Sequence, residues 1–249
     1  MCGTCGCSIT EGNQHLVAVD GELHADGTLD VLKNLLDKNN QTAAHNRQHF
    51  DHHQVLAINI MSSPGAGKTS LLEATIEQLS SDYRIAVIEG DLETENDAQR
   101  IRKHGVTAIQ IETGTACHLD AHLIHDALHQ LDLDEFDIVF IENVGNLVCP
   151  ASFDLGQHFN VTLLSTTEGH DKPEKYPVIF RAADLMLITK QDLLEYLDDF
   201  DPEYAINCLR RLANPAPVIT LSAKTALGID QWSNWVVEKM NIQASSNQA

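Results

Sequence analysis

The 249-residue sequence has no apolar run close to the ~20 residues that a membrane-crossing helix needs. Its first residues have no basic stretch ahead of an apolar core, so we expect no signal peptide. Aromatic residues make up only 5% of the chain, yet 43% of it is hydrophobic, which is typical of an α/β enzyme rather than a disordered chain. These features predict a cytoplasmic protein that does not act at a membrane.

Basic residues are scarce as well. The chain has 16 Lys and Arg against 36 Asp and Glu, which gives a formal net charge of -20. This charge repels a phosphate backbone, so we expect no nucleic-acid partner. The 6 Cys and 13 His are compatible with a protein that handles small cations. Cytosolic thiols stay reduced and are more often metal ligands or redox centres than disulfides.

Three sections follow one another along the chain. Residues 1–36 hold a cysteine-rich head and nearly all of the pattern LDVLKNLLD (residues 29–37), which predicts a short helix. Residues 37–54 are polar and histidine-containing, so we interpret them as a mobile linker. From 55 to 249, short apolar runs alternate with amphipathic stretches such as SLLEATIEQLSS and the closing IDQWSNWVVEKM; the runs are VLAINIM, RIAVIEG, VTAIQIET, DIVFIENV, NVTLLST, ADLMLIT and PVITLS. This alternation predicts an α/β domain with a mostly parallel sheet flanked by helices on both faces.

The first apolar run leads directly into SSPGAGKTSLL. Gly67, Lys68 and Thr69 complete the P-loop pattern G-x-x-x-x-G-K-[ST], although Ser62 replaces its first glycine. The loop's backbone N–H groups can still wrap a phosphate chain, with Lys68 at the β- and γ-phosphates and the Thr69 hydroxyl on Mg²⁺. The alternative is a glycine-rich turn before a helix, but the strand before it and the intact GKT favour the phosphate site. The nucleotide-binding residues predicted here are Ser63, Pro64, Gly65, Ala66, Gly67, Lys68, Thr69 and Ser70.

Two later strand ends supply acidic residues. Glu142 ends an apolar strand, where a Walker-B carboxylate holds the Mg²⁺ shell, and Gly145 completes a D-x-x-G spacing with Glu in place of Asp. Gly145 is then placed to offer its N–H to the γ-phosphate. Asp91 follows RIAVIEG and is expected to close the Mg²⁺ shell or act as a switch; the alternative for Asp91 is a helix cap. The predicted catalytic and Mg²⁺-binding set is Lys68, Thr69, Asp91 and Glu142.

The base is expected to bind further along the chain. TKQD, ending at Asp192, resembles the N-K-x-D element of GTPases, with Thr189 in place of the usual Asn. Asp192 can accept two hydrogen bonds from guanine N1–H and N2–H₂, a pair that adenine cannot offer, while the Lys190 stem lies against the ring. A second element offers a backbone N–H to guanine O6 and consists of Ser222, Ala223 and Lys224. Behind a P-loop, these two elements favour GTP over ATP.

The chain begins MCGTCGC, with Cys2, Cys5 and Cys7 close together. A redox pair, a zinc knuckle and a port for a soft metal ion are the candidate interpretations. A Cys-x-x-Cys redox pair is expected in a βα context, which a free terminus does not provide. Thiolates joined by the Cys2 amine, once Met1 is removed, suit nearly planar Ni²⁺, whereas tetrahedral thiolates suit Zn²⁺.

A C-x-x-C-G-C head followed by a P-loop GTPase domain resembles the HypB family, UreG-related GTPases that help to insert nickel into [NiFe]-hydrogenase. The resemblance covers essentially the whole chain and rests on MCGTCGC, SSPGAGKT, GDLET, TGTACHLDA and IENVGNLVCP. It implies a SIMIBI-like P-loop NTPase fold with a flexible N-terminal metal-binding extension. It also implies a GTP-hydrolysing, Mg²⁺-dependent nickel metallochaperone. Its expected partners are a second copy of the chain, in a homodimer favoured by GTP or metal, hydrogenase maturation proteins and the hydrogenase large-subunit precursor.

Carried over residue by residue, the resemblance implies two sites for Ni²⁺ that can also take Zn²⁺. The tight site is formed by Cys2, Cys5 and Cys7. The weaker site lies near the dimer interface and is formed by Cys117, His118 and Cys149. Two other functions stay open: a urease-type nickel-insertion GTPase, which normally lacks the cysteine head, and a passive nickel or zinc store.

The remaining soft ligands carry less weight in this interpretation. His122, His125 and His129 follow His118 at helical spacing, and we interpret them as a solvated polar face rather than a metal store. We treat the histidines of the linker as auxiliary; they are His45, His49, His52 and His53. Cys208 is interpreted as a packing residue.

Overall fold

The computed structural model describes residues 18–19, 22–23, 25–91, 96–114 and 116–246, and the side chains from residue 33 onward except those of 91, 96 and 246. The strands are β1 (Ala18–Val19), β2 (Glu22–Leu23), β3 (Leu56–Met61), β4 (Ile85–Asp91), β5 (Thr107–Glu112), β6 (Ile138–Glu142), β7 (Phe159–Ser165), β8 (Leu185–Thr189) and β9 (Val218–Thr220). The α-helices are α1 (Ala25–His52), α2 (Lys68–Leu79), α3 (Asn96–Arg102), α4 (Ala121–Leu128), α5 (Lys172–Lys175), α6 (Pro177–Arg181), α7 (Pro202–Arg211) and α8 (Ile229–Ser246). Short 3₁₀ helices are η2 (Leu133–Glu135), η3 (Pro150–Ser152) and η4 (Gln191–Tyr196).

The centre of the molecule is a seven-stranded sheet in the order β5-β4-β6-β3-β7-β8-β9, in which every pairing is parallel. Each apolar run singled out in the sequence forms one of these strands. The strands β3, β6 and β8 are buried along their whole length. Burial on both faces explains why their sequences are continuously apolar rather than alternating. The predicted parallel α/β sheet is confirmed.

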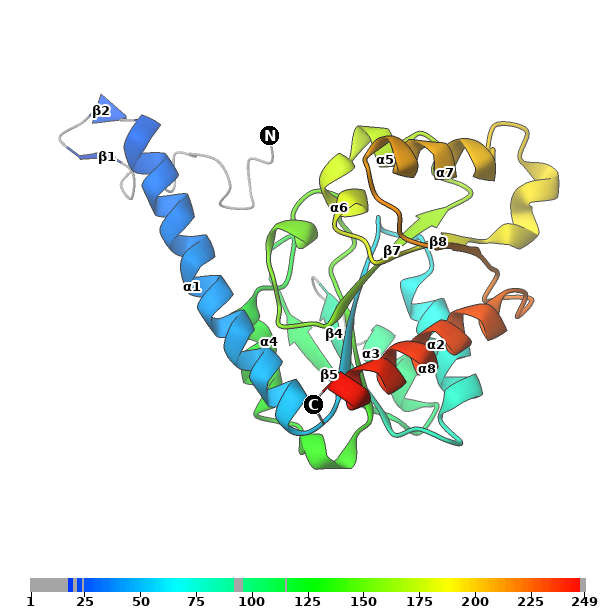
Figure 1. Ribbon diagram of the computed structural model, residues 1–249, viewed down its shortest axis with the longest axis horizontal. Helices are drawn as coiled ribbons and strands as arrows, with labels where there is room; N and C mark the ends of the chain where they lie inside the picture. The colour runs from blue at the N-terminus through cyan, green and yellow to red at the C-terminus, as the bar shows by residue number, and fades with distance from the viewer. Residues whose placement is uncertain (1–17, 20–21, 24, 92–95, 115, 247–249) are drawn as a thin grey trace.

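Helices cover both faces of this sheet (Figure 1). Successive residues of β3 point to opposite faces, so Ile58 joins the core beneath α2, α3 and α8, while Ala57 joins the core beneath α1 and α4. A third cluster packs α6 and α7 against the strands β7 and β8. Because the seven strands of this sheet are all parallel, their carboxyl ends lie along one edge, where ligands bind in open α/β sheets.

The interpretation of residues 37–54 as a mobile linker is wrong, because residues 37–52 belong to the helix α1, which begins at Ala25. Its buried positions are Asn39, Ala43, Asn46 and Phe50, which recur at helical spacing on one face. The Asn39 side chain donates to the Asp154 carbonyl at 2.8 Å. Two of these four buried residues are asparagines whose side-chain amides bond to backbone groups. A search for apolar residues at helical spacing therefore does not detect the face of α1 that packs on the domain. The boundary expected at 36/37 falls inside this helix.

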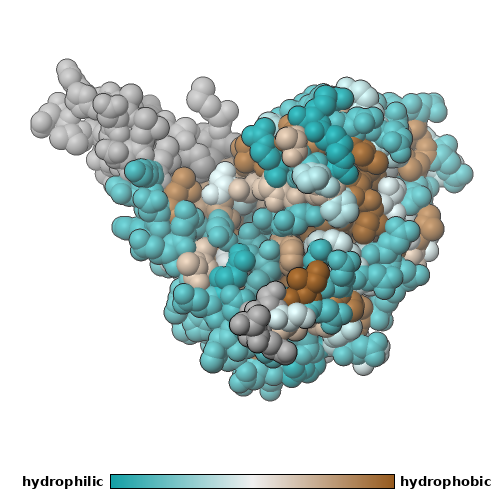
Figure 2. Space-filling model, viewed as in Figure 1, coloured by the Kyte–Doolittle hydropathy of each residue, from teal (hydrophilic) through white to brown (hydrophobic). Residues whose placement is uncertain are grey.

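Figure 1 shows α1 reaching out from the domain, with its carboxyl-terminal half beside α4. The face in Figure 2 is mostly hydrophilic, in keeping with the net charge of -20. Among the described residues, we find no helix with the length and apolar character required to cross a membrane. Cys2, Cys5 and Cys7 lie outside the described residues.

Candidate nucleotide and metal sites

The P-loop connects the end of β3 to the start of α2. Gly67 precedes the first residue of α2 with a φ of 99°, a left-handed conformation that favours glycine. The loop and the neighbouring strand ends enclose a cavity of about 470 Å³ that Lys68, Thr69, Glu142 and Gly145 help to line. A helix N-terminus with exposed N–H groups at such a cavity suits an anionic phosphate chain.

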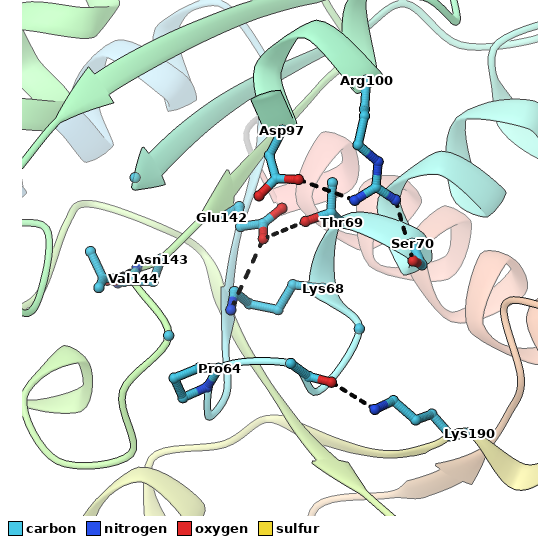
Figure 3. A pocket seen from close by; sticks show the side chains of 14 residues that line it. Pro64, Lys68, Thr69, Ser70, Asp97, Arg100, Glu142, Asn143, Val144 and Lys190 are labelled. Atoms are coloured by element: carbon cyan, nitrogen blue, oxygen red, sulfur yellow. Dashed lines mark hydrogen bonds and ion pairs between the residues drawn. The ribbon is translucent and has the colours of Figure 1, made fainter. Parts of the chain in front are cut away.

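Three of the four side chains expected at the reaction centre, those of Lys68, Thr69 and Glu142, meet inside this cavity (Figure 3). Thr69 Oγ1 donates to Glu142 Oε1 at 3.0 Å, and Lys68 Nζ lies 4.0 Å from the same oxygen. Lys68 Nζ also donates to Ser62 Oγ at 3.2 Å, so the serine that replaces the first P-loop glycine holds the lysine in the cavity. Glu142 Oε2 is buried without a hydrogen-bond partner among the described side chains. A hydroxyl and an unsatisfied carboxylate are ligands that Mg²⁺ accepts, so Thr69 and Glu142 fit a Mg²⁺ site.

Glu89 belongs to this site and was missed from the sequence. It pairs with Glu142 in the register of β4 and β6 and is 1% exposed. Burial, followed by the charge of Glu142, raises the pKa of Glu89 to about 10. Burial raises the pKa of Glu142 only to about 6, because Lys68 and Thr69 oppose the shift. Glu89 therefore holds a proton beside the phosphate cavity at neutral pH. Its sequence signal was a lone acid inside the apolar run RIAVIEG.

Arg100 was also missed, and it brings positive charge to the same cavity. This residue of α3 is held by Glu73, with Nη2 to Oε2 at 2.6 Å, and by Asp97, with Nη1 to Oδ1 at 3.1 Å. Asp97 lines the cavity beside it. No spacing rule relates Arg100 to the P-loop, so only the packing of α3 beside α2 reveals this arrangement.

The predicted base-binding elements enclose a second cavity of about 260 Å³, which shares Gly67, Ser70 and Lys190 with the first. Asp192 points its Oδ1 at the Ser222 hydroxyl, which donates to it at 2.6 Å. Ala223 and Lys224 line the same cavity. The two base elements, which come from separate loops, are thus held together by one side-chain hydrogen bond.

Thr189, which stands where the related element has Asn, still supports the P-loop. Its Oγ1 donates to the Ala66 carbonyl at 2.7 Å. The next residue, Lys190, has a left-handed φ of 59° and donates from Nζ to the Gly65 carbonyl at 2.7 Å. In this structure Lys190 therefore crosses the P-loop and lines both cavities.

The loop after β6 touches the P-loop at Gly145. A Cβ atom on Gly145 would lie 2.9 Å from Pro64 Cα, so the position has no room for a larger residue. Asn143, fully buried, accepts from the Leu119 N–H through Oδ1 at 3.2 Å. Asn146 donates to the Cys117 carbonyl at 3.2 Å. The loop thus contacts the phosphate cavity on one side and the β5–α4 loop on the other.

The second predicted metal cluster lies where these two loops meet. Cys117 Sγ is 3.0 Å from Cys149 Sγ and 3.6 Å from His118 Nδ1, and ligand atoms of all three lie within 4.8 Å of one another. The His118 ring stacks on Phe153 with centres 3.9 Å apart. Burial lowers the pKa of His118, which favours the neutral imidazole that binds metals. Two sulfurs and one nitrogen suit Zn²⁺ or Ni²⁺ and leave coordination positions for another ligand.

Asp91 ends β4, and its backbone pairs with Glu112 in β5. Its side chain lies outside the described residues, so its role at Mg²⁺ stays a prediction. Cys208 is fully buried on α7, as expected of a packing residue.

Comparison with known proteins gives consistent matches over most of the chain. The model of the family described as "CobW/HypB/UreG, nucleotide-binding domain" matches residues 56–220. The hydrogenase maturation factor HypB of Escherichia coli K12 is 51% identical over 231 residues, which are 91% of this chain and 79% of the relative. The crystal structure of HypB from Helicobacter pylori in complex with nickel has a TM-score of 0.79 at 40% identity, covering 82% of this chain and 95% of that one. HypB from Archaeoglobus fulgidus has a TM-score of 0.77 at 39% identity, covering 82% and 100%.

Proposed function

Since the chain belongs to the CobW/HypB/UreG family, we propose that it is a GTP-hydrolysing nickel metallochaperone that delivers Ni²⁺ for the maturation of [NiFe]-hydrogenase. The observation that supports this most directly is the loop of residues 143–149. One end of it lines the phosphate cavity, and the other end carries a ligand of the Cys117 cluster. A hydrolysis site and a soft-metal site that share one loop are what a nucleotide-regulated metal carrier requires.

In the hydrolysis reaction, water attacks the γ-phosphate of GTP and GDP leaves. Lys68 and the P-loop amides stabilise the negative charge that develops on the phosphate oxygens. Thr69 and Glu142 hold Mg²⁺, which supplies further positive charge when bound. Asp192 selects guanine. Among the described residues that line the cavity there is no glutamine to position the attacking water, so the unassisted turnover is expected to be slow.

The cargo binds at the cysteine ligands. Cys2, Cys5 and Cys7 form the tight Ni²⁺ site, and Cys117, His118 and Cys149 form the weaker one. Both also accept Zn²⁺, because thiolate and imidazole ligands do not by themselves separate the two ions. The half-exposed Cys117 and the exposed Val148 put the internal cluster near the surface, where a second copy of the chain can reach it.

Nucleotide state and metal affinity are coupled through the shared loop. When the γ-phosphate is present, it attracts the Gly145 N–H, and the loop moves relative to Pro64. Asn146 and Cys149 follow within four residues, so the distance between Cys149 and Cys117 changes with nucleotide state. The active form is a homodimer favoured by GTP or metal. It acts in the cytoplasm with hydrogenase maturation proteins and the hydrogenase large-subunit precursor.

Nickel titration tests this function. The full chain and a Cys2→Ala/Cys5→Ala/Cys7→Ala variant are each titrated with Ni²⁺ in the presence of GDP and of a non-hydrolysable GTP analogue. We expect two cysteine-ligated sites in the full chain, one in the variant, and a different affinity of the remaining cysteine site with the two nucleotides. Equal affinity in both nucleotide states would refute the coupling.

Two comparisons separate the alternative functions. A passive metal store predicts no GTP turnover that depends on the P-loop, whereas we expect turnover that is lost in Lys68→Ala. A urease-type GTPase predicts nickel transfer that depends on urease precursors. We expect transfer that depends on the hydrogenase large-subunit precursor.

A further inference from the structure

The structure brings four histidines together between α1 and α4, away from both cysteine sites. His45 and His49 lie one turn apart on α1, and His125 and His129 lie one turn apart at the end of α4. The Nε2 atoms of His45 and His49 are 3.1 Å apart, and so are those of His125 and His129. The two pairs are separated by about 80 residues of sequence and are brought together by the packing of α1 on α4.

Within each pair, the separation of the rings fits two ligands of one ion. An imidazole bound at about 2.1 Å through Nε2 has its ring centre about 3.2 Å from the metal. If the two metal–nitrogen bonds meet at 90°, the ring centres lie about 4.5 Å apart. If they meet at the tetrahedral angle, the ring centres lie about 5.2 Å apart. The ring centres are 4.5 Å apart in each pair. Between the helices, the ring centre of His125 lies 5.2 Å from that of His45 and 6.2 Å from that of His49.

A buried amide sets the tautomer of one ligand. Asn46 Nδ2 donates to the carbonyls of Ala121 and Leu155, at 2.8 and 3.0 Å, which leaves Oδ1 to accept from His125 Nδ1 at 3.1 Å. With its proton held on Nδ1, neutral His125 presents the lone pair of Nε2 toward His129. A hydrogen bond of this kind, on the nitrogen away from the ion, is the usual second-shell support of a metal-binding histidine.

The surroundings also favour an ion. His49, His125 and His129 line a cavity of about 240 Å³ together with His53 and Asp132. Burial, followed by the charges of the neighbouring histidines, lowers the pKa of His49 and of His125. Both rings are therefore neutral near pH 7, the form that binds a metal.

We propose that His45, His49, His125 and His129 form a further site for a divalent transition-metal ion with imidazole ligands, and that the ion clamps α1 to α4. Among the described residues, only the Cys117 cluster already has three ligand atoms within 4.8 Å of one another. The four histidines therefore have to move closer to bind one ion, and the ion draws the exposed rings of His45 and His129 inward from their paired positions. Ni²⁺, Zn²⁺, Co²⁺ and Cu²⁺ all accept such a site. A bound ion therefore fixes the position of α1 against α4, and α1 is the helix that joins the amino-terminal segment to the domain.

The test uses the untagged full chain in which Cys2, Cys5, Cys7, Cys117 and Cys149 are replaced by alanine, with Ni²⁺ alone as the probe. We expect this protein to bind one Ni²⁺ at pH 7.5 with only nitrogen and oxygen neighbours in its X-ray absorption spectrum. Adding His49→Gln/His125→Gln is expected to weaken binding at least tenfold. The matched control His104→Gln/His170→Gln removes two histidines elsewhere and is expected to leave the affinity unchanged.

A second pair of substitutions guards against misfolding. His45→Gln/His129→Gln changes exposed side chains only, and we expect it also to weaken Ni²⁺ binding at least tenfold and to abolish the rise in melting temperature that Ni²⁺ produces. Absence of Ni²⁺ binding to the cysteine-free chain overturns the proposal. Equal binding by the control and by both histidine variants overturns it as well. Neither result bears on GTP hydrolysis or on the cysteine sites.

Discussion

Gly145 lies so close to Pro64 that a Cβ atom on the glycine would be 2.9 Å from the proline Cα and 3.0 Å from its nitrogen. The P-loop and the loop after β6 therefore meet with the Gly145 backbone directly against Pro64. We expect a movement of either loop to be transmitted to the other. The loop after β6 then continues to Cys149, which lies 3.0 Å from Cys117 between the sulfur atoms.

Replacement of Gly145 by alanine is expected to separate the two loops. The added methyl group forces the backbone apart, and we expect kcat/KM for GTP to fall by about tenfold or more, which corresponds to about 1.4 kcal/mol. Steady-state GTP hydrolysis measures the effect. Gly105→Ala is the control, since Gly105 has a strained φ of 82° but lies in the turn before β5. Equal losses in the two variants would point to general destabilisation instead.

Substitution of Asp192 tests the base specificity. An amide cannot accept both guanine donors, so Asp192→Asn is expected to lose about 2 kcal/mol or more of GTP affinity. The variant amide can donate to the O2 of xanthine, so XTP should bind better to the variant than to the native protein. Nucleotide affinities measured by fluorescence titration check both changes. Ser222→Ala keeps the carboxylate but removes its 2.6 Å hydrogen bond, and we expect a smaller loss with the preference for guanine retained.

Arg100 is expected to support the chemical step. Its guanidinium lies at the phosphate cavity between Glu73 and Asp97, where it can offset charge on the γ-phosphate. We expect Arg100→Ala to lower kcat by about tenfold with a smaller change in KM, as measured by steady-state GTP hydrolysis. Arg102→Ala is the control, because Arg102 instead binds the Ala108 carbonyl. An unchanged kcat in Arg100→Ala would exclude this role.

The buried proton on Glu89 predicts a pH-dependent stability. The folded pKa of about 10 lies above the unfolded value of 4.5, so the folded chain keeps a proton that the unfolded chain releases. Stability from this group is therefore complete below pH 4.5 and is lost as pH rises toward 10. In metal-free buffer, the free energy of unfolding of Glu89→Gln should exceed that of the native protein by about 1 kcal/mol or more at pH 9. Near pH 4.5 the two free energies should be equal. Urea unfolding at several pH values measures this, with the exposed Glu112→Gln as control. A constant offset at every pH would contradict the assignment.

Asn146 provides a test of the coupling between nucleotide and metal. It donates to the Cys117 carbonyl and accepts from the Val148 N–H, so it joins the two cysteine loops without binding metal itself. In the variant lacking Cys2, Cys5 and Cys7, Asn146→Ala is expected to reduce the nucleotide-dependent change in Ni²⁺ affinity by about half or more. GTP hydrolysis should change little. Retention of the full difference would show that the coupling takes another route.

Motifs whose residues are contiguous could be recognised from the sequence. The strands were predicted because burial on both faces requires continuous apolar runs, and the P-loop because its backbone geometry is set by adjacent residues. The pairing of Asp192 with Ser222 was expected only as two separate elements, and their hydrogen bond emerges from the neighbouring positions of β8 and β9. The docking face of α1 was missed because Asn39 and Asn46, which are polar, form part of it.

By itself the sequence determined the parallel α/β fold and the phosphate loop, since each depends on local hydrophobicity or on neighbouring backbone groups, and it predicted the two elements expected to bind guanine. Only the tertiary structure decided that Glu89 faces Glu142 across two strands, that Arg100 reaches the phosphate cavity, and that histidines of α1 meet those of α4. These contacts join residues far apart in the chain, and their positions follow from sheet register and helix packing. Neither the register of the sheet nor the packing of the helices can be read from the spacing of residues along the sequence.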